Sequence, residues 1–258
     1  LDKDSQNAAA LAFMGKLAAE DNNYVKAIKL TQDAIKLDSL NYTFYLDLGF
    51  YCRQVGRFDD AIKAWNKAIE IDPTYFLAYA YLAGCYDELN KFDLALDNYH
   101  KVIETNPKYY YAYEATAVLE YHQNNYDEAQ RLFDIAYSYS QNYSYKLMNA
   151  AMFFKKGDSF NGKKVINEIL KTMDRESTEY SLVRLYGDTY SKNAVTTLIS
   201  KINKEDDSNK RGKMLFYLGL YYEVFGMQEM SIEYYSKVTK MQAPMFFEYR
   251  IAEWGLGL

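Results

Sequence analysis

The sequence contains only 3 prolines, 12 glycines, 2 cysteines and 2 histidines in 258 residues. The shortage of proline and glycine argues against long disordered linkers and against densely turned β folds. Two cysteines cannot build a disulfide framework, and because Cys52 and Cys85 both fall within helical patterns, we predict that they are buried free thiols. Their redox state, and with it the redox compartment, stays open.

Long apolar runs and an excess of positive charge are absent as well. The longest apolar stretch, residues 8–19, is interrupted by Lys16 and is shorter than the ~18 residues that span a bilayer. The net charge of −5 is spread along the chain, so no basic stripe is available to neutralise nucleic-acid phosphates. The chain begins at Leu1, as expected after removal of an N-terminal targeting segment, although a shortened chain would begin in the same way.

What the sequence does contain is a repeat of 34 residues without insertion or deletion. Its seven windows begin at Ala8, Tyr42, Phe76, Tyr110, Ser144, Thr178 and Gly212. Small residues recur at the eighth and twentieth positions, where two paired helices would cross so closely that a larger side chain would cost about 1–3 kcal/mol. The eighth position holds Gly15, Gly49, Ala83, Ala117, Ala151, Leu185 and Gly219, and the twentieth holds Ala27, Ala61, Ala95, Ala129, Lys163, Thr197 and Ser231.

Other positions of the repeat support paired helices. Gly and Asn stand at the expected turns, where they tolerate the left-handed backbone that closes a helix. Acidic residues follow in the first turn of the next helix, where the helix dipole favours them. Bulky residues at the twenty-fourth position are predicted to fill the space between neighbouring pairs; they are Trp65, Tyr99, Phe133 and Tyr235. Residues 45–73, YLDLGFYCRQVGRFDDAIKAWNKAIEIDP, resemble the tetratricopeptide-repeat (TPR) consensus almost position by position.

The predicted fold is therefore an all-α TPR superhelix, or α-solenoid, of about seven helix pairs in a single array over residues 1–258. The predicted repeats cover residues 8–41, 42–75, 76–109, 110–143, 144–177, 178–211 and 212–245, with a capping helix over 246–258. The fifth and sixth windows are degenerate because Lys163 and Thr197 replace small residues. Gly157 and Gly162 are expected to loosen the fifth helix pair.

The last part of the chain resembles a particular family. The blocks LVRLYGDTYSKNAVTTLISKI, FYLGLYYEVFGMQEMSIEYYSKV and FFEYRIAEWGL, in this order within residues 142–258, are similar to the final repeats and closing helix of the NlpI lipoproteins. The resemblance implies a bacterial, lipid-anchored, homodimeric adaptor that faces the periplasm from the outer membrane. It also implies that such an adaptor brings peptidoglycan hydrolases to a processing protease or to each other.

In a TPR array the first helix of each pair lines the concave face. The positions that hold Lys and Asn in chaperone-binding TPR domains are Leu46 and Phe50 in the second window, so chaperone tails are disfavoured as ligands. The predicted partner-binding residues of this face are aromatic, apolar or acidic: Asp47, Phe50, Tyr81, Asp87, Glu88, Tyr111, Glu114, Tyr121, Tyr145, Met148, Met152 and Phe216. Partial burial would raise the pKa of Glu114 unless a cation pairs with it.

Two interpretations of this face stay open. In the first, it binds an extended or helical peptide with apolar anchors and a basic residue. In the second, its side chains contact a C-terminal helix of the same chain, and partners bind the convex face or a dimer seam instead. Because no catalytic constellation is present, we predict no enzyme, no cofactor and no metal site. His100 and His122 lie in different repeats without ligands at metal-binding spacing and are interpreted as surface residues.

The sequence thus favours a non-catalytic adaptor or scaffold of the bacterial cell envelope that binds other proteins, as the resemblance implies. The alternative is a structural subunit of a cytoplasmic assembly that uses the same fold.

Overall fold

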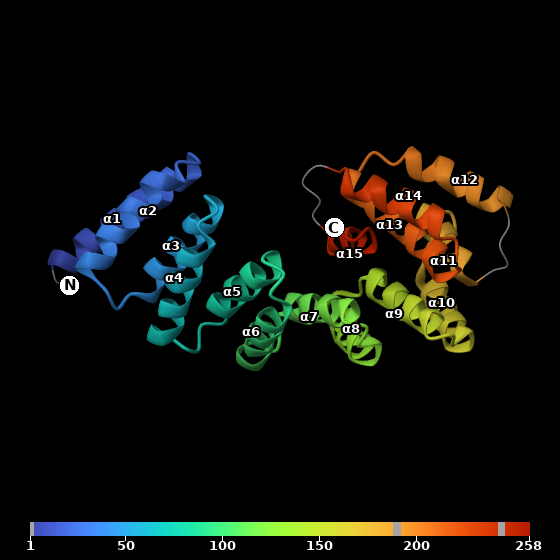
Figure 1. Ribbon diagram of the computed structural model, residues 1–258, viewed down its shortest axis with the longest axis horizontal. Coiled ribbons are helices and arrows are strands. Elements are labelled where there is room, and N and C mark those ends of the chain that lie inside the picture. The colour runs from blue at the N-terminus through green and yellow to red at the C-terminus, as the bar shows by residue number, and fades with distance from the viewer. Residues whose placement is uncertain (1–2, 188–191, 242–245) are drawn as a thin grey trace. The chain divides into compact units, whose positions relative to one another are not determined.

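The computed structural model describes residues 3–187, 192–241 and 246–258, and all the regular structure in them is helical (Figure 1). The helices are α1 (Lys3–Glu20), α2 (Tyr24–Leu37), α3 (Tyr42–Gln54), α4 (Phe58–Ile71), α5 (Phe76–Glu88), α6 (Phe92–Thr105), α7 (Tyr110–His122), α8 (Tyr126–Ser140), α9 (Tyr143–Lys155), α10 (Ser159–Thr172), α11 (Thr178–Gly187), α12 (Lys192–Asn203), α13 (Ser208–Val224), α14 (Gln228–Thr239) and α15 (Glu248–Gly255). The predicted fold class, an all-α TPR solenoid, is confirmed.

The chain forms two compact units, residues 1–112 and 113–258. In the first unit, α1 packs on α2, α3 on α4 and α5 on α6. In the second unit, α9 packs on α10 and α13 on α14, and α15 contacts both α13 and α14. The prediction of a single array over residues 1–258 stays a prediction.

The turns within helix pairs have the predicted left-handed residues. Gly56, Asn90 and Asn124 have φ angles of 74°, 55° and 63°. Short turns of this kind bring the second helix of a pair back along the first, so that their apolar faces meet. Cys52 and Cys85 are buried free thiols, as predicted, and burial raises the pKa of both.

The predicted close crossing is clearest at Gly49 in α3. A methyl group at this position would lie 2.6 Å from Cδ1 of the Trp65 indole, which belongs to α4. Gly84 in α5 provides a contrast, because a methyl group there would meet only the Tyr99 hydroxyl, at 3.9 Å. The two helical glycines thus differ in what surrounds them.

We expect Gly49→Ala to lower the free energy of unfolding by about 1–3 kcal/mol, because the indole has to move. Gly84→Ala is expected to raise it by about 0.5–1 kcal/mol, because alanine loses less conformational freedom in a helix and no clash arises. Urea unfolding of both variants measures the difference. Equal effects at the two positions would contradict the close crossing.

Two predictions for the fifth helix pair, α9 and α10, are wrong. Gly162 does not loosen the pair: it is buried, and a methyl group on it would lie 2.9 Å from the Phe154 ring. The small-residue contact therefore falls one residue earlier than the repeat frame predicts. Lys163, which occupies the predicted position, is exposed instead.

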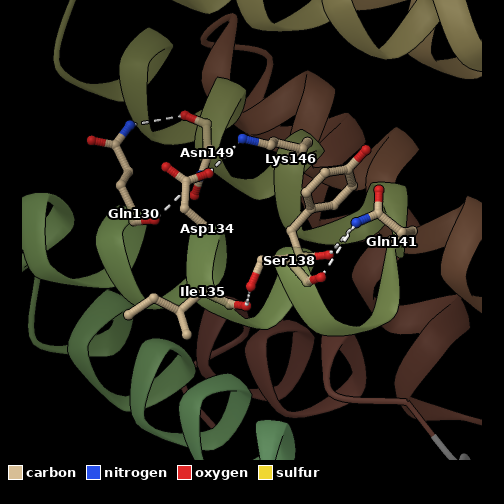
Figure 2. A network of polar contacts seen from close by, with 8 residues as sticks. Gln130, Asp134, Ile135, Ser138, Gln141, Lys146 and Asn149 are labelled. Carbon is tan, nitrogen blue, oxygen red and sulfur yellow. Dashed lines mark hydrogen bonds and ion pairs between the residues drawn. The ribbon is translucent and has the colours of Figure 1, made fainter.

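A buried polar contact joins α8 to α9 (Figure 2). The Asn149 amide donates hydrogen bonds to Asp134 Oδ1 (2.9 Å) and to the Gln130 carbonyl (3.3 Å), and the Gln130 amide donates to the Asn149 carbonyl (3.0 Å). Lys146 Nζ also donates to Asp134 Oδ1, at 2.6 Å. The amide nitrogen of Asn149 is thus hydrogen-bonded, whereas its Oδ1 is buried without a partner in the described chain. These contacts link the two helices.

Candidate functional site

In the first unit, aromatic side chains of the first helices remain open to solvent. Phe50 of α3, Tyr81 of α5 and Tyr111 at the start of α7 are 37%, 36% and 52% exposed. They occupy positions nine, six and two of their windows, so each lies about one helical turn earlier than the one before it. All three were predicted to line the concave face.

Neighbouring aromatic rings, of which Trp65 and Tyr51 are buried and Tyr110 is half-buried, hold these exposed rings in place. The Tyr81 ring centroid lies 5.8 Å from that of Trp65. Tyr111 stacks on Tyr110 at 4.2 Å. The Phe50 ring meets Tyr51 edge-on at 5.9 Å. Because each ring rests on a neighbour, it presents a rigid apolar surface whose immobilisation on binding costs little entropy.

Two ion pairs lie on the same helices. Lys16 Nζ of α1 lies 3.3 Å from Asp47 Oδ2 of α3, and Arg53 Nε of α3 lies 2.7 Å from Glu88 Oε2 of α5. Burial raises the pKa of Asp47, and the nearby Lys16 partly offsets this effect. The Arg53–Glu88 pair is largely exposed and contributes only about 0–1 kcal/mol to stability, whereas Asp47 of the first pair is half-buried.

Gly84 lies between the exposed and charged residues of α5. With Tyr81 three residues before it and Glu88 four residues after it, all three share one helix face. Because the space above Gly84 is open, a ligand backbone or ring can approach the helix closely there. Asp87, also a predicted site residue, is half-buried beside this stripe.

Besides Gly84, sequence reasoning missed three residues of this face. Phe13 of α1 is 61% exposed and stands at the sixth position of its window, as Asp47 and Tyr81 do. Lys16 and Arg53 form ion pairs with Asp47 and Glu88, which are predicted site residues. The 34-residue frame identifies all three, if the first window is treated like the others. We define the unit-1 face as Phe13, Lys16, Asp47, Phe50, Arg53, Tyr81, Gly84, Asp87, Glu88 and Tyr111.

In the second unit most of the predicted concave-face residues are covered by other parts of the chain. All but one of the predicted residues here are buried: Tyr121, Tyr145, Met148, Met152 and Phe216. Phe247, the residue before α15, covers Tyr145, and Tyr235 of α14 stacks on Phe216. Phe247 lies 5.7 Å from Phe133 of α8 and 5.8 Å from Tyr145 of α9, measured between ring centroids. The second interpretation of the sequence, a groove filled by a C-terminal helix, therefore describes this unit.

Glu114 of α7 is partly buried, and its pKa is raised, as predicted. It accepts a hydrogen bond from the Tyr145 hydroxyl. Burial is the main cause that raises the pKa of Glu114, the hydrogen bond from Tyr145 lowers it, and the nearby acid Glu248 raises it further. Its carboxyl group is thus engaged within the unit.

The interpretation of His122 as a surface residue is wrong. Its imidazole stacks on the Trp254 indole of α15, with ring centroids 4.0 Å apart. Burial and the nearby Arg250 lower the pKa of His122. His100 is exposed, as predicted. No cluster of His, Cys, Asp and Glu within the described residues has the arrangement of a metal site.

Comparisons with known proteins agree with this architecture. Residues 52–86 match the family model described as TPR repeat, and residues 86–145 match the model described as tetratricopeptide repeat. No curated protein matched the chain in a sequence search. None of the helices in the described ranges is long and apolar enough to cross a membrane.

Among solved structures, a TPR protein from Parabacteroides merdae is 17% identical, with a TM-score of 0.64, and the match covers 98% of each chain. A structure of MamA is 19% identical, with a TM-score of 0.60 over 66% of this chain and 94% of the other. YrrB, a TPR protein with an unusual peptide-binding site, is 16% identical, with a TM-score of 0.53 over 62% of this chain and 84% of the other. At these identities the likeness shows the fold alone. Residues 52–145 therefore contain TPR repeats, and the chain has the fold of TPR proteins, which generally mediate protein–protein interaction.

Proposed function

We propose that this protein is a non-catalytic adaptor that binds a segment of another protein on the unit-1 face. The observation that carries the proposal is the row of supported, exposed aromatic rings, Phe50, Tyr81 and Tyr111, on the first helices. Interface anchors are typically aromatic side chains that are already held in place before binding. The peptide-binding site of the similarly folded YrrB supports a peptide as the ligand.

The charge of the first unit favours a basic partner. Residues 1–112 contain 16 acidic and 12 basic side chains, a formal charge of −4, whereas residues 113–258 contain 19 and 18, a charge of −1. On the face itself, Asp47, Asp87 and Glu88 stand against Lys16 and Arg53. A ligand with aromatic or aliphatic anchors and a Lys or Arg beside them complements this surface.

We further propose that this adaptor acts in the bacterial cell envelope, as the NlpI-like C-terminal blocks suggest. Its partners would then be peptidoglycan hydrolases or a periplasmic protease, and a lipid anchor and a homodimer would accompany them. The alternative is a cytoplasmic assembly with the same binding face. Cell fractionation of the tagged protein separates the two, because the envelope proposal requires it in the membrane fraction.

Tyr81→Ala is expected to weaken partner binding about tenfold, because it removes an anchor ring and leaves the Trp65 indole partly uncovered. The measurement is a pull-down from the native envelope fraction, identification by mass spectrometry, and titration of the purified partner. Val25→Ala is the matched control, since Val25 is an exposed apolar residue of α2 outside the unit-1 face. Equal affinity of both variants would rule out the unit-1 face.

A further inference from the structure

The short helix α15 contacts the rest of its unit as a bound peptide would. It has 8 residues, and an isolated helix of this length is not stable in water. Phe247 packs against both rings of the Phe133–Tyr145 pair, and Trp254 stacks on His122. The helical conformation of α15 therefore depends on the groove that receives it.

The groove buries an acid of α15. Glu248 is 0% exposed, and the Tyr217 hydroxyl donates a hydrogen bond of 2.9 Å to its Oε1. Within the described part of the chain, neither Glu248 Oε2 nor Ser144 Oγ has a hydrogen-bond partner. A buried carboxylate oxygen without a donor is costly, whereas a protonated carboxyl group is tolerated. The docked helix therefore favours neutral Glu248.

Some of the groups that face Glu248 stabilise its charged form, and others disfavour it. They are Tyr217 and Lys213 of α13, Tyr143 and Ser144 of α9, and Glu114 of α7. Burial is the main cause that raises the pKa of Glu248 above 4.5. The charge of Lys213, hydrogen bonding by the Glu248 backbone and Tyr217, and the nearby Ser144 hydroxyl lower this pKa without cancelling the rise. Glu114, whose pKa is also raised, disfavours a second negative charge.

The consequence for docking follows from proton linkage. A pKa that is higher in the docked state means that the docked helix binds protons more tightly than the released one. The contribution of Glu248 to docking is then greatest below the ordinary pKa of about 4.5 and is lost as the pH rises through the raised pKa of the docked state. Glu114 shifts docking in the same direction. The lowered pKa of His122, which stacks on Trp254, acts in the opposite sense, because it weakens docking as the pH falls.

We propose that α15 is a releasable plug, and that its release opens a binding site for a partner helix of the same chemistry. This partner carries an aromatic residue followed directly by an acid, with a second aromatic six residues further on, as Phe247, Glu248 and Trp254 do. Phe133 and Tyr145 receive the first ring, Tyr217 the acid and His122 the second ring. The site lies wholly in the second unit and is independent of the unit-1 face.

Release is measured on the full chain labelled with fluorotryptophan, whose two fluorine signals report Trp65 and Trp254 separately. As the pH rises from about 4.5, the Trp254 signal is expected to move towards that of a solvent-exposed tryptophan while the Trp65 signal stays constant. In Glu248→Gln the Trp254 signal is expected to stay docked, because the acid is then permanently neutral.

Three outcomes would overturn the proposal that ionisation of Glu248 releases α15. The Trp254 signal could be independent of pH, or it could change together with that of Trp65, which would indicate global unfolding. It could also respond in Glu248→Gln as in the wild type and lose the response in His122→Phe, which would assign the titration to the stacked imidazole.

Exchange with a partner is tested with a fluorescent peptide of residues 246–258 added to the full chain. Binding is expected to be at least about tenfold tighter to the Phe247→Ala chain than to the wild type, whose own helix occupies the groove. The same peptide with Phe247→Ala is the control and is expected not to bind. Equal affinity of the two chains, or of the two peptides, would overturn the exchange. Far-UV circular dichroism verifies that the variant chain is folded.

Discussion

Trp65→Ala is expected to lower the free energy of unfolding of the first unit by about 3–5 kcal/mol. Trp65 is 1% exposed, and its indole fills the space that Gly49 leaves open. Its Nε1–H donates to the Leu46 carbonyl at 3.2 Å. Its ring also supports Tyr81 in the next helix pair. Removing it leaves a cavity that rigid neighbouring helices cannot close.

The measurement is urea unfolding followed by far-UV circular dichroism, fitted with separate transitions for the two units because a single two-state transition is not assured. Trp65→Phe is the control: it keeps most of the ring and loses the hydrogen bond, so a loss of about 1–2 kcal/mol is expected. If Trp65→Ala lowers the free energy of unfolding by less than about 1 kcal/mol, the Trp65 indole does not hold neighbouring helix pairs together.

Tyr235→Ala is expected to cost the second unit about 3–5 kcal/mol and to loosen α15. Tyr235 of α14 is 1% exposed and stacks on Phe216 of α13 at 5.6 Å. Methyl groups on Gly219 of α13 and Gly255 of α15 would lie 2.8 and 2.6 Å from its ring. One side chain therefore holds the last helix pair to the terminal helix.

Tyr235→Phe separates packing from hydrogen bonding. It keeps the ring but loses the hydroxyl, which donates to Glu223 at 2.5 Å, so a loss of about 1–3 kcal/mol is expected. Hydrogen exchange of residues 248–255 reports α15 directly. If these amides stay as protected in Tyr235→Ala as in the wild type, Tyr235 does not hold the helix.

The sequence predicts the helix pairs where its small and turn residues follow the repeat. As predicted, Gly49 lies at a close helix crossing and Gly56 has a positive φ angle. Few residues other than glycine fit either position. The frame fails at Lys163, because Gly162 supplies the same close contact one residue earlier. A fixed period cannot reveal such a shift, since the helix needs only one small residue near the crossing.

The site is less predictable than the fold. Phe50 and Tyr145 look alike in the sequence, both aromatic and both on a first helix. Phe50 remains exposed, whereas Phe247 covers Tyr145, because α15 packs into the second unit from more than 100 residues further along the chain. Periodicity contains no information on such a contact. The burial of Glu248 within an otherwise amphipathic helix is likewise visible only in three dimensions.

The most direct test of the central claim places a photo-cross-linking amino acid at Tyr81 in the native organism, with Val25 as the control position. If the unit-1 face is the protein-binding surface, light produces a defined adduct with another protein from position 81 and none from position 25. Absence of an adduct at position 81, or the same adducts from both positions, would contradict the account.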